Sequence, residues 1–261
     1  MVGVGPTRDD SRVGVLGPTH VSIGGFEVRI SPQARGLVTR LALAGTEVVR
    51  IDALAESIWQ GDPPGSHRKV IHNRVTELRH HSRGLIRSDG AGYALGAEVA
   101  LDCAELEASV AGVERLLAAE SPRAAVDLAA LAAGLWRGTP FTDLDHHEAH
   151  GRRLVLEECW HVLNERRAEA LLRCHDPVGA VVVLEALVTK SPLVERRWWL
   201  LVVALYASRR RSDALRAFQR ARVILREEAG LDPGHEMVEL ERAILDGNPV
   251  DLARHVAGVA S

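Results

Sequence analysis

Similar small or apolar residues recur 34 positions apart in the second half of the chain. The pairs are Ala170/Ala204, Leu171/Leu205, Ala180/Ala214, Val183/Ala217, Leu184/Phe218 and Leu187/Ala221. Small residues let two helices approach closely, and larger ones fill the groove between successive helix pairs. The spacing therefore predicts a stack of helix pairs, because one pair alone could not bury its apolar faces.

Thirty-four residues is the period of the tetratricopeptide helix pair. No strand pattern is visible from about Asp102 onward, and short Gly/Pro-containing breaks at 138–140, 176–177, 191–192 and 232–233 separate the helices. Trp198 and Trp199 are adjacent and cannot both face one core, so we expect one of them to line a groove. A plain helical bundle is the alternative, and either arrangement offers an interaction surface rather than a reaction centre.

The first hundred residues show short strand-like runs before helices. RVGVLG, THVSI and FEVRI, within residues 12–30, are broken by glycine and proline and predict a small antiparallel sheet. A helix should begin at Ser31-Pro32, with Ser31 as its N-cap, and end at Gly45. A second should begin near Asp52, capped by that carboxylate, and stop before GDPPG at 61–65.

A third helix is predicted from Ser66, as its N-cap, to about Ser82. Its apolar residues recur at helical spacing and should face the core: Ile71, Val75 and Leu78. The opposite face presents Lys69, Asn73, Thr76, Glu77 and His80. Arg68, His72 and Arg79 lie on one flank of this face, and Arg74 lies on the other.

A hairpin is predicted after this helix, over residues 84–95. Its strands are Leu85-Ile86-Arg87 and Tyr93-Ala94-Leu95, with Gly90 and Gly92 in the turn. A small sheet, three helices and a hairpin, in this order, are typical of a winged helix. In that arrangement the third helix enters the major groove of DNA, and Arg87 on the hairpin lies beside a phosphate strand.

Positive charge is concentrated on the third helix. Residues 66–87 carry six Arg or Lys against one acid, Glu77, although the whole chain has a formal net charge of −3. Residues 1–96 hold 12 basic and 9 acidic residues, whereas residues 97–261 hold 20 and 26. Such a cluster on a helix indicates a phosphate-backbone partner. A solvated helix face is the alternative, but the winged-helix order favours DNA.

Several other classes of protein are disfavoured. No apolar run is long enough for a membrane span and no signal peptide is visible, while three cysteines without CxxC spacing indicate a reducing cytoplasm. His146 and His150 lie one helical turn apart, but the segment is not HExxH and has no clear third ligand nearby. Because GxSxG, GxGxxG and P-loop motifs are also missing from the sequence, we expect no enzyme, no cofactor and no metal.

Four segments, taken together, resemble one family. WRGTPFTDL at 136–144 and AGLDPGHEMVELERAIL at 229–245 are similar to the opening and closing signatures of the bacterial transcriptional activation domain. The stretch 31–64 resembles the OmpR-type winged helix that precedes this domain, and DCAELE at 102–107 resembles the junction between the two. The combination, from about residue 12 to 249, is similar to SARP-class activators, the antibiotic regulatory proteins of actinomycetes.

The resemblance implies a fold that is mostly α with a small β component. An N-terminal winged helix-turn-helix DNA-binding domain would span 12–97, and a C-terminal all-α tetratricopeptide-like helical repeat domain, the transcriptional activation domain, would span 102–249. Residues 1–11 and 250–261 are expected to be flexible termini.

The resemblance also implies a mechanism. SARP-class activators bind direct repeats in promoters as side-by-side protomers and recruit RNA polymerase through its sigma factor and other subunits. The expected partners are therefore double-stranded promoter DNA and RNA polymerase, with no membrane, for a cytoplasmic activator of a secondary-metabolism pathway such as antibiotic biosynthesis. The loop before the third helix would contact the polymerase, through Gln60, Asp62, Pro63 and Pro64.

Site residues can be carried over by position. Asn73 and Glu77 are the central base-reading positions, and the predicted base-reading face is Lys69, Asn73, Thr76, Glu77 and His80. The predicted phosphate contacts are Arg68, His72, Arg74, Arg79 and Arg87. Family members usually have an apolar residue at position 73 and Arg at position 77. Asn suits adenine and Glu accepts from cytosine N4, so we expect altered base preference or weaker binding.

A further departure is Arg209, where the family commonly has a helix-ending glycine. An arginine adopts the left-handed conformation only at some cost, so we expect this helix to end differently. The main alternative function is a helical-repeat module that binds a protein or a small effector, with a winged helix that binds DNA weakly.

Overall fold

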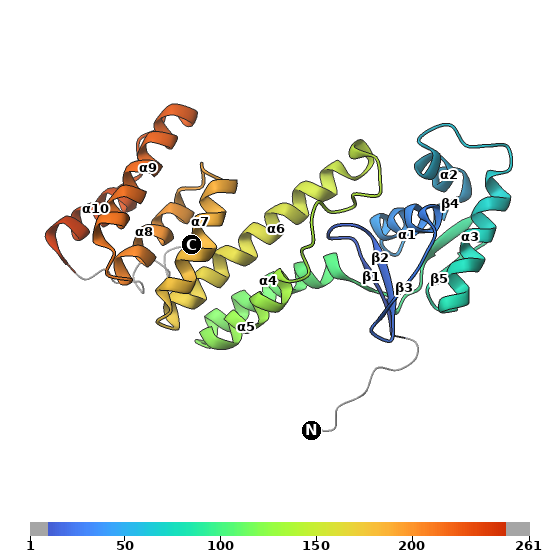
Figure 1. Ribbon diagram of the computed structural model, residues 1–261, viewed down its shortest axis with the longest axis horizontal. Helices are drawn as coiled ribbons and strands as arrows, with labels where there is room; N and C mark the ends of the chain where they lie inside the picture. Colours follow the sequence, from blue (N-terminus) through green and yellow to red (C-terminus); the bar gives the residue numbers. More distant parts are fainter. Residues whose placement is uncertain (1–9, 249–261) are drawn as a thin grey trace, which may run out of the picture. The chain divides into compact units, whose positions relative to one another are not determined.

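The computed structural model describes residues 10–248, apart from the side chain of His146. The order of its helices and strands can be followed in Figure 1. The predicted flexible termini fall outside the described residues except for Asp10 and Ser11. Ser11 begins the first strand and is buried, and its hydroxyl donates to the Ser82 hydroxyl at 3.1 Å.

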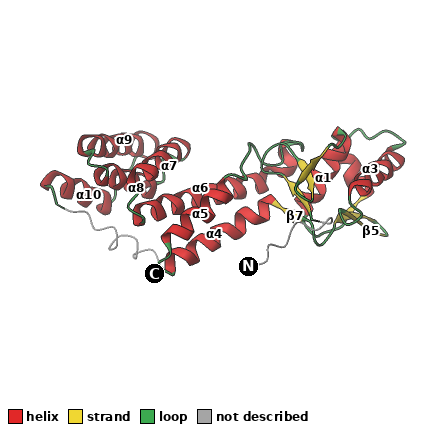
Figure 2. Cartoon of the chain, turned by 60° about the horizontal axis from the view of Figure 1, so that its bottom comes forward, coloured by secondary structure: helices red, strands yellow, loops and turns green. Residues whose placement is uncertain are grey.

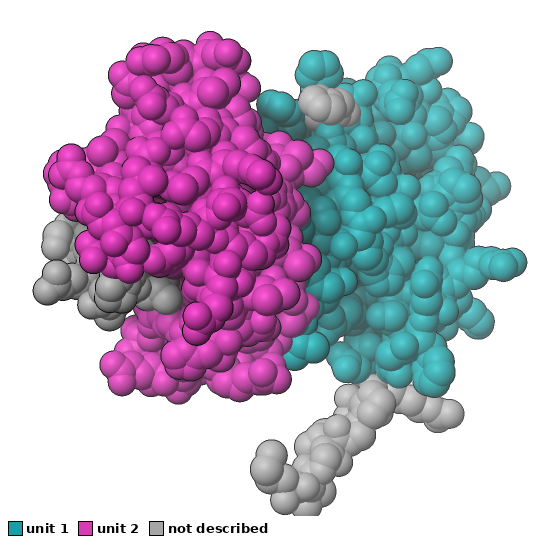
Figure 3. All heavy atoms as spheres, turned by 60° about the vertical axis from the view of Figure 1, so that its left-hand side comes forward, with its two compact units in different colours: residues 1–109, 131–160 teal, residues 110–130, 161–261 magenta. Residues whose placement is uncertain are grey.

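The chain divides into two compact units, which Figure 3 colours separately. The first unit comprises residues 1–109 and 131–160, and the second comprises 110–130 and 161–261. This division differs from the predicted boundary near residue 100, because the beginning of the long helical part groups with the N-terminal elements.

A sheet of four strands in the first unit confirms the predicted strand runs. Its strands are β1 (Ser11–Gly14), β2 (His20–Ile23), β3 (Phe26–Val28) and β7 (Ala100–Leu101). The order is β3-β2-β1-β7, with β1 antiparallel to β2 and parallel to β7. Figure 2 draws the strands in yellow and labels β7. The sequence did not reveal β7, since two residues show no alternation of apolar and polar side chains.

Three helices follow: α1 (Pro32–Ala44), α2 (Ile51–Trp59) and α3 (His67–His81). Ser31 caps α1 as predicted, since its hydroxyl accepts the Ala34 amide. The predicted cap of α2 was wrong. This helix begins at Ile51, after an N-cap residue Arg50 whose side chain makes no capping bond, and Asp52 pairs with Arg68 instead. Ser66 occupies the N-cap position of α3, but its side chain makes no capping bond.

The predicted hairpin is present as β5 (Ile86–Asp89) and β6 (Gly92–Leu95). A short strand that the sequence did not reveal, β4 (Val49–Arg50), pairs with β6, giving a sheet of order β4-β6-β5. Gly92 lies in β6 rather than in the turn. A Cβ there would meet the Val49 carbonyl oxygen at 2.0 Å, so only glycine lets β4 approach β6 this closely.

The rest of the described chain is helical. Its helices are α4 (Asp102–Ala118), α5 (Pro122–Ala133), α6 (His146–Arg173), α7 (Pro177–Lys190), α8 (Glu195–Ala207), α9 (Arg211–Ala229) and α10 (His235–Asp246). Nearly all residues of the 34-residue pairs are buried, as the repeat predicts, and only Val183 is half-buried. Within residues 10–248, no helix has the length and apolar character to cross a membrane. The predicted fold class is confirmed.

Helix α8 is buried on all sides. Every residue from Arg197 to Leu205 is buried, because α7, α9 and α10 pack around this helix. The expectation that Trp198 or Trp199 lines a groove was therefore wrong, since their exposed fractions are 1% and 2%. The expectation assumed a single core on one side of the helix.

Turns that join helices in the repeat share one backbone conformation. His175 and Arg209, 34 positions apart, have φ angles of +57° and +60°. The Arg209 and Arg210 amides donate to the Tyr206 and Leu205 carbonyls, the bonding pattern of a Schellman motif. The expectation that Arg209 changes the helix end was therefore wrong. Arg209 itself adopts the left-handed conformation for which glycine is the usual residue.

Candidate nucleic-acid interface

Helix α3 has one buried face and one polar exposed face. Ile71, Val75 and Leu78 are at most 2% exposed and lie in the core of the winged helix. Lys69, Asn73, Thr76 and His80 are exposed, and at roughly 100° per residue they fall within an arc of about 60°. We call these four residues the α3 stripe. They include four of the five predicted base-reading residues.

The fifth, Glu77, lies beside this stripe and is half-buried. Its carboxylate accepts the Ser31 amide at 2.8 Å and the Ser31 hydroxyl at 3.0 Å. Arg74, a predicted phosphate contact, donates to the same carboxylate at 2.6 Å and to the Ser31 hydroxyl at 3.0 Å. We call Ser31, Arg74 and Glu77 the Ser31 clasp. It joins α3 to the N-terminus of α1.

The other flank of α3 carries three predicted phosphate contacts that also have partners in the protein. Arg68 pairs with Asp52 at 2.7 Å, and His72 Nδ1 lies 2.5 Å from the Tyr93 hydroxyl. Arg79 donates to the Ile86 carbonyl and to the Ser88 hydroxyl, so it ties α3 to the wing. Burial raises the pKa of Tyr93.

Arg87, the predicted phosphate contact of the wing, lies on β5 and is exposed. Its guanidinium donates to the Thr46 carbonyl at 2.6 Å, in the segment that follows α1. The wing is therefore anchored to α3 through Arg79 and to the segment after α1 through Arg87.

The predicted polymerase-contact loop follows α2. Gln60, Asp62 and Pro64 are exposed and Pro63 is half-buried. Gln60 takes a φ of +52°, and its backbone N–H donates to the Glu56 carbonyl. It also lines a polar cleft of about 380 Å³, together with residues of α1, α2 and the start of α6: Arg40, Ala53, Glu56, Ser57, Asp145, His147 and Glu148.

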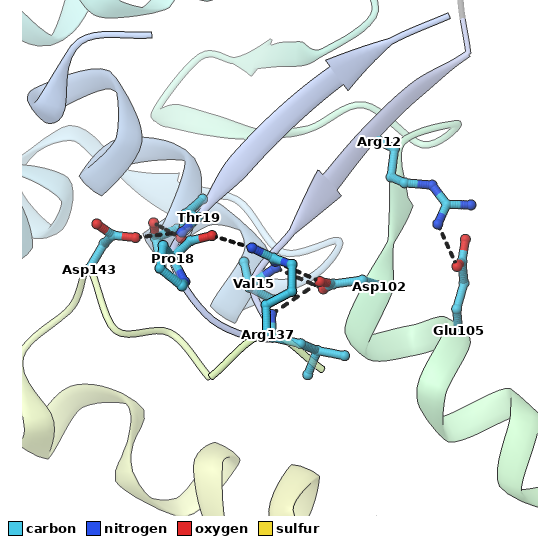
Figure 4. Close-up of polar contacts among 10 residues, drawn as sticks. Arg12, Val15, Pro18, Thr19, Asp102, Glu105, Arg137 and Asp143 are labelled. Carbon is cyan, nitrogen blue, oxygen red and sulfur yellow. Dashed lines mark hydrogen bonds and ion pairs between the residues drawn. The ribbon is translucent and has the colours of Figure 1, made fainter. Parts of the chain in front are cut away.

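A buried group that the sequence reasoning missed lies where β1 meets the helical part. Asp102, 3% exposed, accepts the Val15 and Leu16 amides at 2.8 and 3.1 Å (Figure 4). The Arg137 guanidinium lies 3.2 Å from the same carboxylate and donates to the Pro18 carbonyl at 2.6 Å. The signal that could have revealed it was an acid, Asp102, at the very start of the predicted helical part, with no other role assigned to it.

The segment that resembles the opening signature of the activation domain completes this group. The Phe141 amide donates to the Val15 carbonyl, and Asp143 accepts the Thr19 amide. We call Asp102, Arg137 and Asp143, with residues 15–19, the Asp102 junction. Burial and the nearby Arg137 lower the pKa of His20, so this imidazole stays neutral beside the arginine.

Comparison with known proteins agrees with this arrangement. The family described as Bacterial transcriptional activator domain matches residues 101–245, more than half of the chain. The regulatory protein DnrI of Streptomyces peucetius is 30% identical over 257 residues, which cover 91% of this chain and 93% of DnrI. The regulatory protein AfsR of Streptomyces griseus is 34% identical over 251 residues, 95% of this chain but only 26% of AfsR.

A solved structure shows the same fold. Mycobacterium tuberculosis EmbR, in complex with a low affinity phosphopeptide, superposes with a TM-score of 0.79 at 30% identity, over 94% of this chain and 67% of that one. The present chain thus spans about a quarter of AfsR and about two thirds of EmbR.

The winged helix, the helical repeat and these relatives define a transcriptional regulator. The chain belongs to the bacterial transcriptional activator domain family and, within it, to the SARP class of transcriptional activators.

Proposed function

We propose that this activator binds DNA sequence-specifically, with α3 in the major groove and the β5–β6 wing beside a phosphate strand. The observation that carries the proposal is the α3 stripe, an exposed polar face on the third helix of a winged helix. In functional terms, residues 12–97 bind DNA, and residues 102–249 form the activation domain.

The stripe has the chemistry to read bases. Lys69 donates to guanine, and Asn73 at its centre can pair bidentately with adenine. Thr76 and His80 extend the same face. Phosphate contacts come from the flanks and the wing: Arg68, His72, Arg74, Arg79 and Arg87. Glu77 was predicted to accept from cytosine N4, but its carboxylate accepts from Ser31 and Arg74.

Membership of the SARP class supports the rest of the proposal, which concerns the DNA site, the polymerase contact and the target genes. Two protomers bind direct repeats of a promoter side by side, in the cytoplasm, and recruit RNA polymerase, including its sigma factor. The exposed loop Gln60–Pro64 is the proposed polymerase contact. The target genes belong to a secondary-metabolism pathway, in line with the SARP class to which the relatives belong.

A titration of a promoter fragment at two salt concentrations tests DNA binding. Arg68→Ala should weaken binding to all sequences and flatten the slope of log K against log[salt] by about one, because one phosphate contact is lost. Asn73→Ala should change base preference instead, by roughly 1–3 kcal/mol at one base pair. Arg123→Ala, on an exposed face of α5, is the control and should bind like the wild type.

Feeble binding without sequence preference would contradict the proposal and favour the interaction module. The observation behind that alternative is an apolar face on α7, where Val178 and Val182 are 66% and 71% exposed.

A further inference from the structure

The Ser31 clasp bears on which residues of α3 can reach a base. Its carboxylate, Glu77, is held by three donors: the Ser31 amide, the Ser31 hydroxyl and the Arg74 guanidinium. The Ser31 hydroxyl in turn accepts the Ala34 amide at 3.3 Å and so caps α1. One side chain of α3 therefore completes the N-terminus of another helix.

The clasp also suits the electrostatics of that helix end. The N-terminus of α1 carries partial positive charge, and α1 has no acidic residue in its own first turn. Glu77 provides the negative charge from α3, and Arg74 neutralises it. Turning the carboxylate toward DNA would leave the half-buried Ser31 amide without its acceptor.

The position of Glu77 on α3 agrees with this role. With roughly 100° between successive residues, Glu77 lies about 70° from the centre of the α3 stripe, on the side of Arg74. The stripe residues are exposed, whereas the side chains of Arg74 and Glu77 are 28% and 25% exposed.

We infer that Glu77 is a positioning residue, which fixes the orientation of the recognition helix through the Ser31 cap of α1, and that base selection falls to Lys69, Asn73, Thr76 and His80. This inference rests on the proposed DNA binding. It explains how an acid is tolerated at the centre of a basic segment, since Arg74 neutralises its charge before any phosphate approaches.

The test compares Glu77→Ala, Ser31→Ala and the double variant on a set of sites in which each base pair is changed in turn. Each single variant should bind the best site about tenfold more weakly, with unchanged preference at every base pair. The double variant should lose less affinity than the product of the two single losses, because both changes remove the bond between the Ser31 hydroxyl and the Glu77 carboxylate. Glu77→Gln, which still presents an oxygen to the Ser31 amide, should recover part of the loss.

Asn73→Ala is the positive control and should shift preference at one base pair by tenfold or more. The inference is overturned if Glu77→Ala shifts preference in that way while Ser31→Ala does not, or if the two single losses multiply in the double variant.

Failure of the proposed function would look different, because the wild type itself would then select no sequence. In that case thermal unfolding of the wild type, the two single alanine variants and the double variant tests the clasp: a shift in the double variant smaller than the sum of the two single shifts supports it, and additive shifts overturn it. Glu77→Gln keeps both readouts usable if an alanine variant does not fold.

Discussion

Arg209 holds a conformation that other residue types adopt more easily. It is exposed, its φ is +60°, and it closes the turn between α8 and α9 in a Schellman motif. The Cβ of an L-residue crowds the following carbonyl oxygen in this region, whereas glycine has no such contact.

Arg209→Gly should therefore stabilise the protein by about 0.5–1 kcal/mol, since the relieved strain exceeds the extra freedom of glycine in the unfolded chain. The measurement is the midpoint of thermal or urea unfolding. Arg210→Gly is the matched control: with a φ of −98° and an ion pair to Asp213, it should give no gain. A lower midpoint for Arg209→Gly would contradict this account.

Residue-level prediction from the sequence succeeded where one local rule decides the outcome. Ser31, followed by proline, was predicted correctly as a cap. Asp52 was not, because a tertiary partner, Arg68, holds its carboxylate. Glu77 fits the helical periodicity of a base-reading face, yet its contacts with Ser31 depend on how α1 and α3 pack, which periodicity does not contain.

At the scale of elements, the wing depends on one close approach. Gly92 in β6 lies against the Val49 carbonyl of β4, and through β4 the segment between α1 and α2 joins the wing sheet. A side chain at this position cannot be accommodated unless the two strands separate.

Gly92→Ala should destabilise the protein by about 1–3 kcal/mol, through overpacking against backbone. It should also weaken binding to promoter DNA, because the wing is displaced from α3. Unfolding midpoints and the same promoter titration measure the two effects. Gly90→Ala, in the neighbouring turn with no atom within 4 Å of its Cβ, should be close to the wild type. Equal effects of the two changes would refute the close-approach explanation.

Long periodic elements could be predicted, and short ones could not. The three helices of the winged helix and the 34-residue repeat follow from apolar spacing, and all are present. Strands β4 and β7, of two residues each, carry no periodic signal and exist only through pairing with distant strands. Burial on all sides of α8 likewise depends on three neighbouring helices.

At the scale of the whole molecule, the Asp102 junction joins segments that are far apart in sequence. The Asp102 carboxylate satisfies two buried amides of residues 15 and 16 and also pairs with Arg137. The first compact unit therefore includes chain beyond the predicted end of the DNA-binding domain.

Asp102→Ala should lower the free energy of unfolding by about 2–5 kcal/mol, because it leaves the Val15 and Leu16 amides buried without an acceptor. Chemical denaturation of the full chain measures this. Glu105→Gln, which weakens the half-buried pair with Arg12 one turn later, should cost about 1 kcal/mol or less. A similar loss in both variants would mean that Asp102 acts only as a surface charge.

The link between α3 and the wing has a consequence for the duplex itself. Arg79 donates from α3 to β5, and Arg87 of β5 donates to the Thr46 carbonyl just after α1, so the distance from the α3 stripe to the wing is set before DNA is present. In the proposed docking, a duplex whose groove has an unsuitable width has to bend, widen its groove or unstack base pairs before it can contact both the α3 stripe and the wing. Because stiffness varies among base steps, selection would extend to base pairs that no side chain touches.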